Sequence, residues 1–125
     1  MYHRLDAVLA RHHRLLVWLF WIALAISLAV ASDPHPIHVP WNPGDKLQHM
    51  MAFAALTLVG RAAYFRERWL PLLGGLAAFG ALIEFVQMIP VLHRDAELLD
   101  WVADCSAMLV TATLIQIMTK RLAKD

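Results

Sequence analysis

Four apolar segments, each long enough to cross a lipid bilayer, occupy most of this 125-residue chain. A transmembrane helix needs about 20 predominantly apolar residues, because the hydrocarbon core is about 30 Å thick and a helix rises about 1.5 Å per residue. Residues 15–31 meet this length without a charged side chain, whereas residues 47–65, 69–89 and 98–118 each include a few polar ones. We therefore expect an all-α fold: one integral membrane domain over residues 1–125, built as a bundle of four transmembrane helices.

The basic residues outside these segments predict the orientation of the helices. Nine of the 11 lysines and arginines lie in the two tails and in or beside the connection between the second and third segments. Cytoplasmic loops carry an excess of basic residues, so we expect both termini in the cytoplasm and the other two connections outside. The small residues before Ser32 resemble a signal-peptide cleavage site, but the length and the Trp and Phe content of the first segment favour a retained helix.

The composition favours a membrane protein over a soluble domain, a nucleic-acid-binding protein or a disulfide-bonded one. The chain is 60% hydrophobic and 17% charged, against about 45–50% and about 25% in soluble domains. Its net charge is +1, and the basic residues fit anchors near anionic lipid better than a nucleic-acid surface. The single cysteine, Cys105, excludes an internal disulfide. No cofactor and no nucleic-acid partner are expected.

Eight polar residues lie at or near the outer ends of the last three segments. Residues three or four positions apart share a helix face, and this spacing pairs polar residues on each of the three helices. Glu84 lies six residues before Pro90, about 9 Å inside the outer end, where a charge costs about 2.5–3.5 kcal/mol on insertion scales. We expect these residues to form a binding site open to the outer leaflet: Asp45, Lys46, His49, Glu84, Gln87, Arg94, Asp100 and Asp104.

Several of these residues also have ordinary structural interpretations. Asp45 and Asp100 stand at helix starts, where an aspartate commonly caps the helix. Lys46 is typical of an anchor whose ammonium group reaches the interface. His49 alone is more often a hydrogen-bonded histidine between helices than a catalytic one. A structural or assembly protein, whose polar residues only fix the helix register, therefore remains an alternative.

The arrangement of these residues resembles the motifs of VanZ-like membrane proteins over about residues 42–108. The motifs are Asp45-Lys46-x-x-His49, Glu84-x-x-Gln87, and Arg94 followed by Asp100 and Asp104. The chain departs from the family pattern at Asp104, where the family usually has Asn, and at Ala107, where it usually has Gly. The resemblance implies a multi-pass protein of the bacterial cytoplasmic membrane with a role in the cell envelope. The family is named after a factor associated with teicoplanin resistance, and the resemblance implies neither a reaction nor resistance here.

The first functional hypothesis is binding of an anionic lipid or a lipid-linked envelope headgroup. Lys46 and Arg94 would bind phosphate, and Gln87 and Asp100 would orient the headgroup or the basic residues. If catalysis follows, His49 with Glu84 or Asp104 could act as an acid–base pair. No nucleophile is recognised, since Cys105 is isolated and Ser106 has no evident base beside it, so the question of an enzyme stays open.

Two further hypotheses use the same residues. Glu84, His49 and Asp104 would form a proton-responsive path in a small transporter or flippase component. The inner halves of the helices are almost wholly apolar, so such a path would require a homodimer or another partner. A metal site formed by His49, Glu84, Asp100 and Asp104, with His35 or His93, has suitable ligand types. No short His or Cys motif supports it and the two basic residues disfavour a cation, so the sequence predicts no metal.

Overall fold

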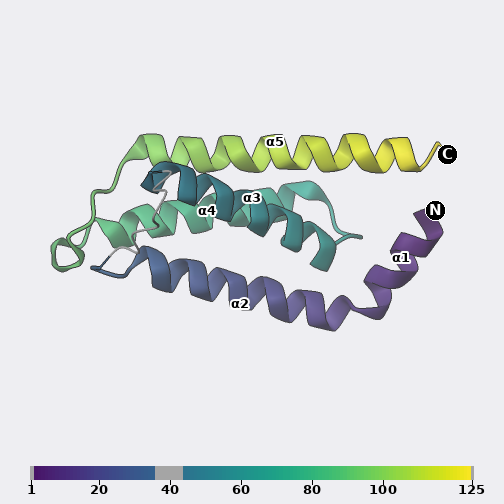
Figure 1. Cartoon of the computed structure of the whole chain (residues 1–125), viewed down its shortest axis with the longest axis horizontal. Helices are drawn as coiled ribbons and strands as arrows, with labels where there is room; N and C mark the ends of the chain where they lie inside the picture. The colour runs from purple at the N-terminus through teal and green to yellow at the C-terminus, as the bar shows by residue number, and fades with distance from the viewer. Residues whose placement is uncertain (1, 36–43, 125) are drawn as a thin grey trace.

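The computed structural model is all-helical and describes residues 2–35 and 44–124 (Figure 1). Its elements are α1 (Tyr2–Arg11), α2 (His13–Ala31), α3 (Asp45–Ala63), α4 (Trp69–Gln87), the short 3₁₀ helix η1 (Pro90–Leu92) and α5 (Leu98–Leu122). Helices α2 to α5 agree within four residues with the four predicted segments. The predicted all-α fold is therefore confirmed. Most of the proline-rich connection between α2 and α3 lies outside the described residues.

Helix α1 was not predicted and is a correction to the expected set of four helices. It has ten residues, fewer than a membrane span requires, so a search for long apolar segments does not detect it. Leu5 and Val8 are exposed on a helix that also carries Arg4 and Arg11. Figure 1 shows α1 set at an angle to α2, at the same end of the bundle as the C-terminus. A short helix of this composition is suited to lie in a membrane interface.

Among the described residues, three helices are long and apolar enough to cross a membrane: α2, α4 and α5. Their outer surfaces are strongly apolar, since Trp18 is 68% exposed, Leu70 80% and Phe85 70%. Soluble monomers rarely expose extended apolar surfaces of this kind, whereas the acyl chains of a bilayer solvate them. The helices thus have the surface expected of a membrane protein.

Helix α3 is as long as α2 and α4, but polar residues in its first turns and Arg61 near its end make it less apolar. It packs against α2, α4 and α5, and the side chains of Phe53, Leu56 and Thr57 are almost fully buried. The side of α3 that its neighbours leave exposed carries Leu47, Met51 and Leu58. Its contacts with three neighbours explain how the most polar of the four long helices fits in an apolar bundle.

Two glycines allow the helices to approach each other closely. A Cβ atom at Gly60 would lie 2.7 Å from Leu72 Cδ1 on α4 and 2.8 Å from Phe20 Cε2 on α2. At Gly80 it would lie 3.2 Å from Trp101 Cδ1 and 3.3 Å from Phe53 Cζ. Small residues serve this purpose in membrane bundles, where close packing replaces the hydrophobic effect between helices. Gly60 therefore sets the distance of α3 from both α2 and α4.

Candidate functional site

The expected polar residues gather at the end of the bundle opposite the described termini (Figure 1). Lys46 and His49 lie in the first turns of α3, and Asp100 and Asp104 lie in the first turns of α5. The last turn of α4 contributes Glu84 and Gln87, and the connection from α4 to α5 contributes Arg94 and Glu97. Helix α3 also begins at Asp45, whose side chain lies outside the described part of the structure.

Lys46 forms an ion-pair group with two carboxylates. Its Nζ atom lies 3.2 Å from Asp100 Oδ1 and 3.8 Å from Glu97 Oε2. The side chain of Asp100 is 12% exposed and that of Lys46 is 48% exposed. Lys46 lies in the first turn of α3, and its ammonium group is closer to Asp100 than to Glu97. The structure therefore places Asp100 beside a basic residue, and its role in orienting a headgroup or a basic residue stays a prediction.

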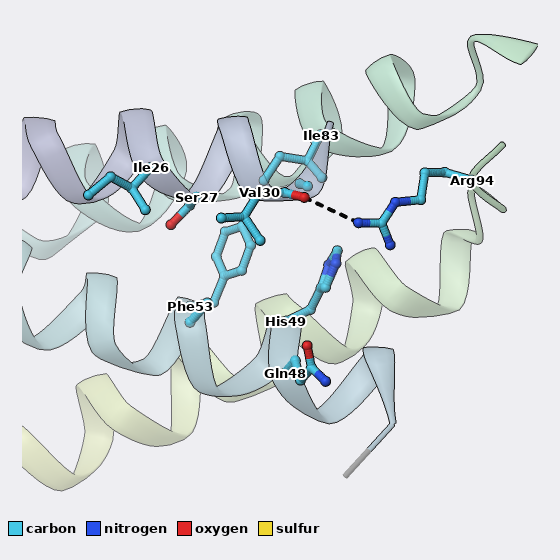
Figure 2. A pocket seen from close by; sticks show the side chains of 10 residues that line it. Ile26, Ser27, Val30, Gln48, His49, Phe53, Ile83 and Arg94 are labelled. Carbon is cyan, nitrogen blue, oxygen red and sulfur yellow. Dashed lines mark hydrogen bonds between the residues drawn. The ribbon is translucent and has the colours of Figure 1, made fainter. Parts of the chain in front are cut away.

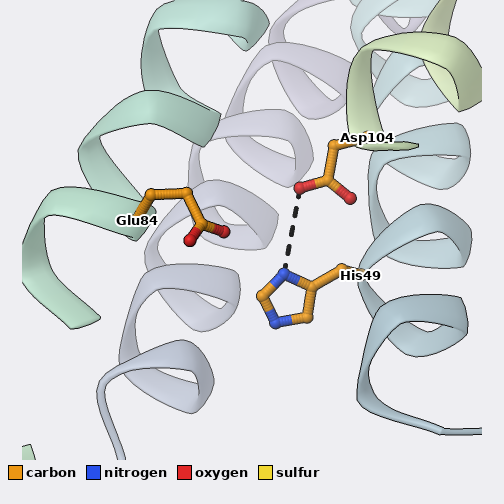
Figure 3. A group of neighbouring side chains, drawn as sticks. All are labelled: His49, Glu84 and Asp104. Atoms are coloured by element: carbon orange, nitrogen blue, oxygen red, sulfur yellow. Dashed lines mark ion pairs between the residues drawn. The ribbon is translucent and has the colours of Figure 1, made fainter. Parts of the chain in front are cut away.

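His49, Glu84 and Asp104 form a second group, which we call the buried carboxylate centre (Figure 3). One nitrogen or oxygen atom from each residue lies within 4.8 Å of the corresponding atoms of the other two. His49 Nδ1 and Asp104 Oδ2 are 3.8 Å apart, with side chains 12% and 2% exposed. Three separate helices supply these residues, so the centre exists only when α3, α4 and α5 pack together.

The hydrogen bonding of this centre is incomplete. Glu84 Oε2 accepts a hydrogen bond of 3.0 Å from the backbone N–H of Glu97. Glu84 Oε1 and both carboxylate oxygens of Asp104 are buried, and none has a hydrogen-bond partner among the described residues. Leaving a buried polar atom without a partner costs about 1–3 kcal/mol, and more for a charged group. Most buried side-chain polar atoms in proteins have a hydrogen-bond partner, so these atoms differ from those of an ordinary structural polar cluster.

Arg94 and Gln87 bind the carbonyl end of α2. Arg94 donates hydrogen bonds of 3.0 Å from Nε to Asp33 O and 3.2 Å from Nη2 to Val30 O. Gln87 is buried, and its Nε2 donates a hydrogen bond of 3.0 Å to Ala31 O. The last carbonyls of a helix lack partners within the helix, so these two side chains complete α2. The sequence analysis predicts that Arg94 and Gln87 bind a ligand, and it does not include this structural role.

A pocket of about 290 Å³ lies beside these residues, between α2 and α3 (Figure 2). Its walls include the apolar side chains of Ile26, Phe53 and Ile83. Its polar lining includes Gln48, His49 and Arg94, with the guanidinium group of Arg94 hydrogen-bonded to Val30 at one side. The pocket therefore combines an apolar wall with a polar end, and His49 belongs both to this lining and to the buried carboxylate centre.

Sequence reasoning missed two residues of this region, Glu97 and Gln48. Glu97 is the N-cap residue of α5 and joins Lys46 to Glu84, through its side chain and its backbone N–H respectively. In the sequence, its position three residues before Asp100 could have indicated that Glu97 belongs to this region. His35 pairs with Asp33 at 3.8 Å, and among the described residues neither it nor His93 belongs to the cluster of possible metal ligands.

Comparison of the chain with models of known families, with curated proteins and with solved structures finds no match. The resemblance to VanZ-like proteins therefore stays a prediction, and the site itself must support any function.

Proposed function

We propose that α2, α3, α4 and α5 all cross the bacterial cytoplasmic membrane, with both termini in the cytoplasm. Helix α3 matches α2 and α4 in length, packs against α2, α4 and α5, and exposes Leu47, Met51 and Leu58. The described ends of the chain lie at one end of the bundle (Figure 1), as an even number of spans requires. The excess of basic residues at this end supports the cytoplasmic orientation.

Labelling of single cysteines tests this topology. In a Cys105→Ala background, Asp95→Cys and Arg66→Cys place a thiol at exposed positions in opposite connections. We expect a membrane-impermeant maleimide to label the Asp95→Cys protein in intact cells and the Arg66→Cys protein only after lysis. The reverse pattern, or labelling of both in intact cells, would contradict the proposed orientation.

The pocket supports binding of an anionic lipid or a lipid-linked envelope headgroup, and it is the observation that carries this function. The apolar wall suits an acyl or prenyl chain, and the polar end suits a headgroup (Figure 2). Arginine binds phosphate through planar, charge-assisted hydrogen bonds, and Arg94 stands at this end. The half-exposed Lys46, which pairs with Asp100 and Glu97, lies at the same end of the bundle.

Binding of phosphatidylglycerol and of undecaprenyl phosphate to the detergent-purified chain tests this function. Charge-assisted hydrogen bonds contribute about 1.5–3 kcal/mol, so we expect Arg94→Gln to weaken binding about tenfold or more. Gln48→Leu, which removes a polar group of the pocket without touching the end of α2, should weaken it less. Native mass spectrometry in the presence of EDTA measures both ligands under the same conditions.

The matched control is Arg66→Gln, which removes one positive charge from the exposed inner turn. Helical circular dichroism identifies any variant that has lost its fold. If folded Arg94→Gln and Gln48→Leu proteins bind both lipids as tightly as the wild type, the pocket does not hold the headgroup.

A further inference from the structure

The geometry points to a second ligand at this end of the bundle: we propose that His49, Glu84 and Asp104 bind one divalent transition-metal cation, of the Zn²⁺ or Mn²⁺ class. Imidazole and carboxylate ligands together suit these ions. This inference goes beyond the proposed function, because a cation can bind to the centre whether or not a lipid occupies the pocket.

The spacing of the three side chains is the first argument. The 3.8 Å between His49 Nδ1 and Asp104 Oδ2 is too long for a hydrogen bond. Two atoms at this separation, each about 2.1 Å from one ion, subtend an angle of about 130° at the ion. All three ligand atoms lie within 4.8 Å of one another, and two such bonds span at most about 4.2 Å. A small rotation of the Glu84 side chain covers a difference of this size.

The burial of Asp104 is the second and independent argument. Its residue is 1% exposed, its carboxylate points into the centre (Figure 3), and neither oxygen has a hydrogen-bond partner among the described residues. Buried charges in proteins are paired or coordinate metals. The 3.8 Å ion pair with His49 is a weak partner for so deeply buried a group, and a bound cation would satisfy both oxygens.

The third argument is the charge around the centre. In the sequence, the two basic residues Lys46 and Arg94 disfavour a bound cation. In the structure Lys46 pairs with Asp100 and Glu97, and Arg94 donates hydrogen bonds to backbone carbonyls of α2 and of the residues after it. These contacts engage the ammonium group of Lys46 and two nitrogens of the Arg94 guanidinium group. Two carboxylates and one imidazole then give the centre the charge that a divalent cation balances.

The surroundings of Glu84 also resemble those of a metal ligand. Ligating carboxylates are commonly held by an outer hydrogen bond that fixes their orientation. The backbone N–H of Glu97 makes such a bond to Oε2, and Oε1 remains buried without a hydrogen-bond partner in the described structure. Three protein ligands leave coordination positions for water or for a phosphate oxygen, and His49 places the ion beside the lipid pocket.

Metal titration of the full chain in detergent, without added lipid, tests this site. After EDTA treatment and its removal, we expect calorimetry to show one Zn²⁺ or Mn²⁺ bound per chain. Asp104→Asn and Glu84→Gln should each weaken binding at least tenfold. Asp95→Asn, which removes an exposed carboxylate from the outer connection, should bind like the wild type. With Co²⁺ as probe, His49→Gln should change the visible absorption spectrum, because it removes the nitrogen ligand.

Absence of stoichiometric binding by the folded wild type would overturn this inference, as would undiminished binding by folded Asp104→Asn and Glu84→Gln. Two variants are used so that the test remains decisive if one of them misfolds. Because this titration contains no lipid and the lipid assay contains EDTA, failure of the metal site and failure of the lipid site are separate results.

Discussion

Replacing Gly60 with valine is expected to separate α3 from its neighbours and to destabilise the bundle by about 3 kcal/mol, near the upper end for an overpacked site. Even a Cβ atom at this position would lie 2.7 Å from Leu72 and 2.8 Å from Phe20, and valine adds two methyl groups. Phe20 also packs edge-on against the ring of Tyr64, which restricts its movement. Unfolding in a rising fraction of sodium dodecyl sulfate, followed by circular dichroism, measures the loss.

Gly74→Val is the matched control for this substitution. Gly74 lies in α4, and a Cβ atom there would have no neighbour within 4 Å. Valine is also a better helix former than glycine, so stability should be unchanged or slightly increased. If both valine variants lost the same stability, helix propensity or lipid contact would explain the effect, and the close approach at Gly60 would not.

Replacing Asp104 with asparagine is expected to stabilise the metal-free protein by about 1–3 kcal/mol while weakening metal binding. A charged side chain at membrane depth costs about 2.5–3.5 kcal/mol, and Asp104 is fully buried without a hydrogen-bond partner among the described residues. Asparagine has nearly the same shape and removes the charge. The same detergent unfolding, performed with EDTA, gives the free energy.

Asp100→Asn serves as the comparison, since it makes the same chemical change four residues earlier in α5. Asp100 lies 3.2 Å from Lys46 Nζ, so the amide would give up an ion pair, and no gain in stability is expected. A gain for Asp104→Asn without a gain for Asp100→Asn would show that the buried carboxylate is retained for a purpose other than folding. Destabilisation by both would indicate a structural polar plug.

The helices and the meeting of the polar residues could be predicted because both depend on short-range rules. The length needed to cross a membrane predicts α2, α4 and α5, and a spacing of three or four residues places Glu84 and Gln87 on one side of α4. Depth then brings His49, Glu84 and Asp104 to the same level. Their convergence within 4.8 Å follows from these rules once the helices are packed.

The pairing among the polar residues could not be predicted, because it depends on how loops and helices pack in three dimensions. No local pattern indicates that Arg94 binds carbonyls more than 60 positions earlier in the chain, or that Gln87 reaches Ala31. The ion pairs of Lys46 with Asp100 and Glu97 likewise depend on where α5 begins. Helix α1 was missed for a different reason, since its ten residues fall below the length that marks a span.

The central position of α3 has a consequence for how the protein is made. In the proposed topology, a segment that carries Lys46, His49 and Arg61 would enter the lipid from the translocon less readily than its neighbours. Two of the helices that pack against it, α4 and α5, are synthesised after it. We therefore expect α3 to remain at the translocon or at the bilayer surface during translation and to settle between its partners only when α5 has emerged from the ribosome.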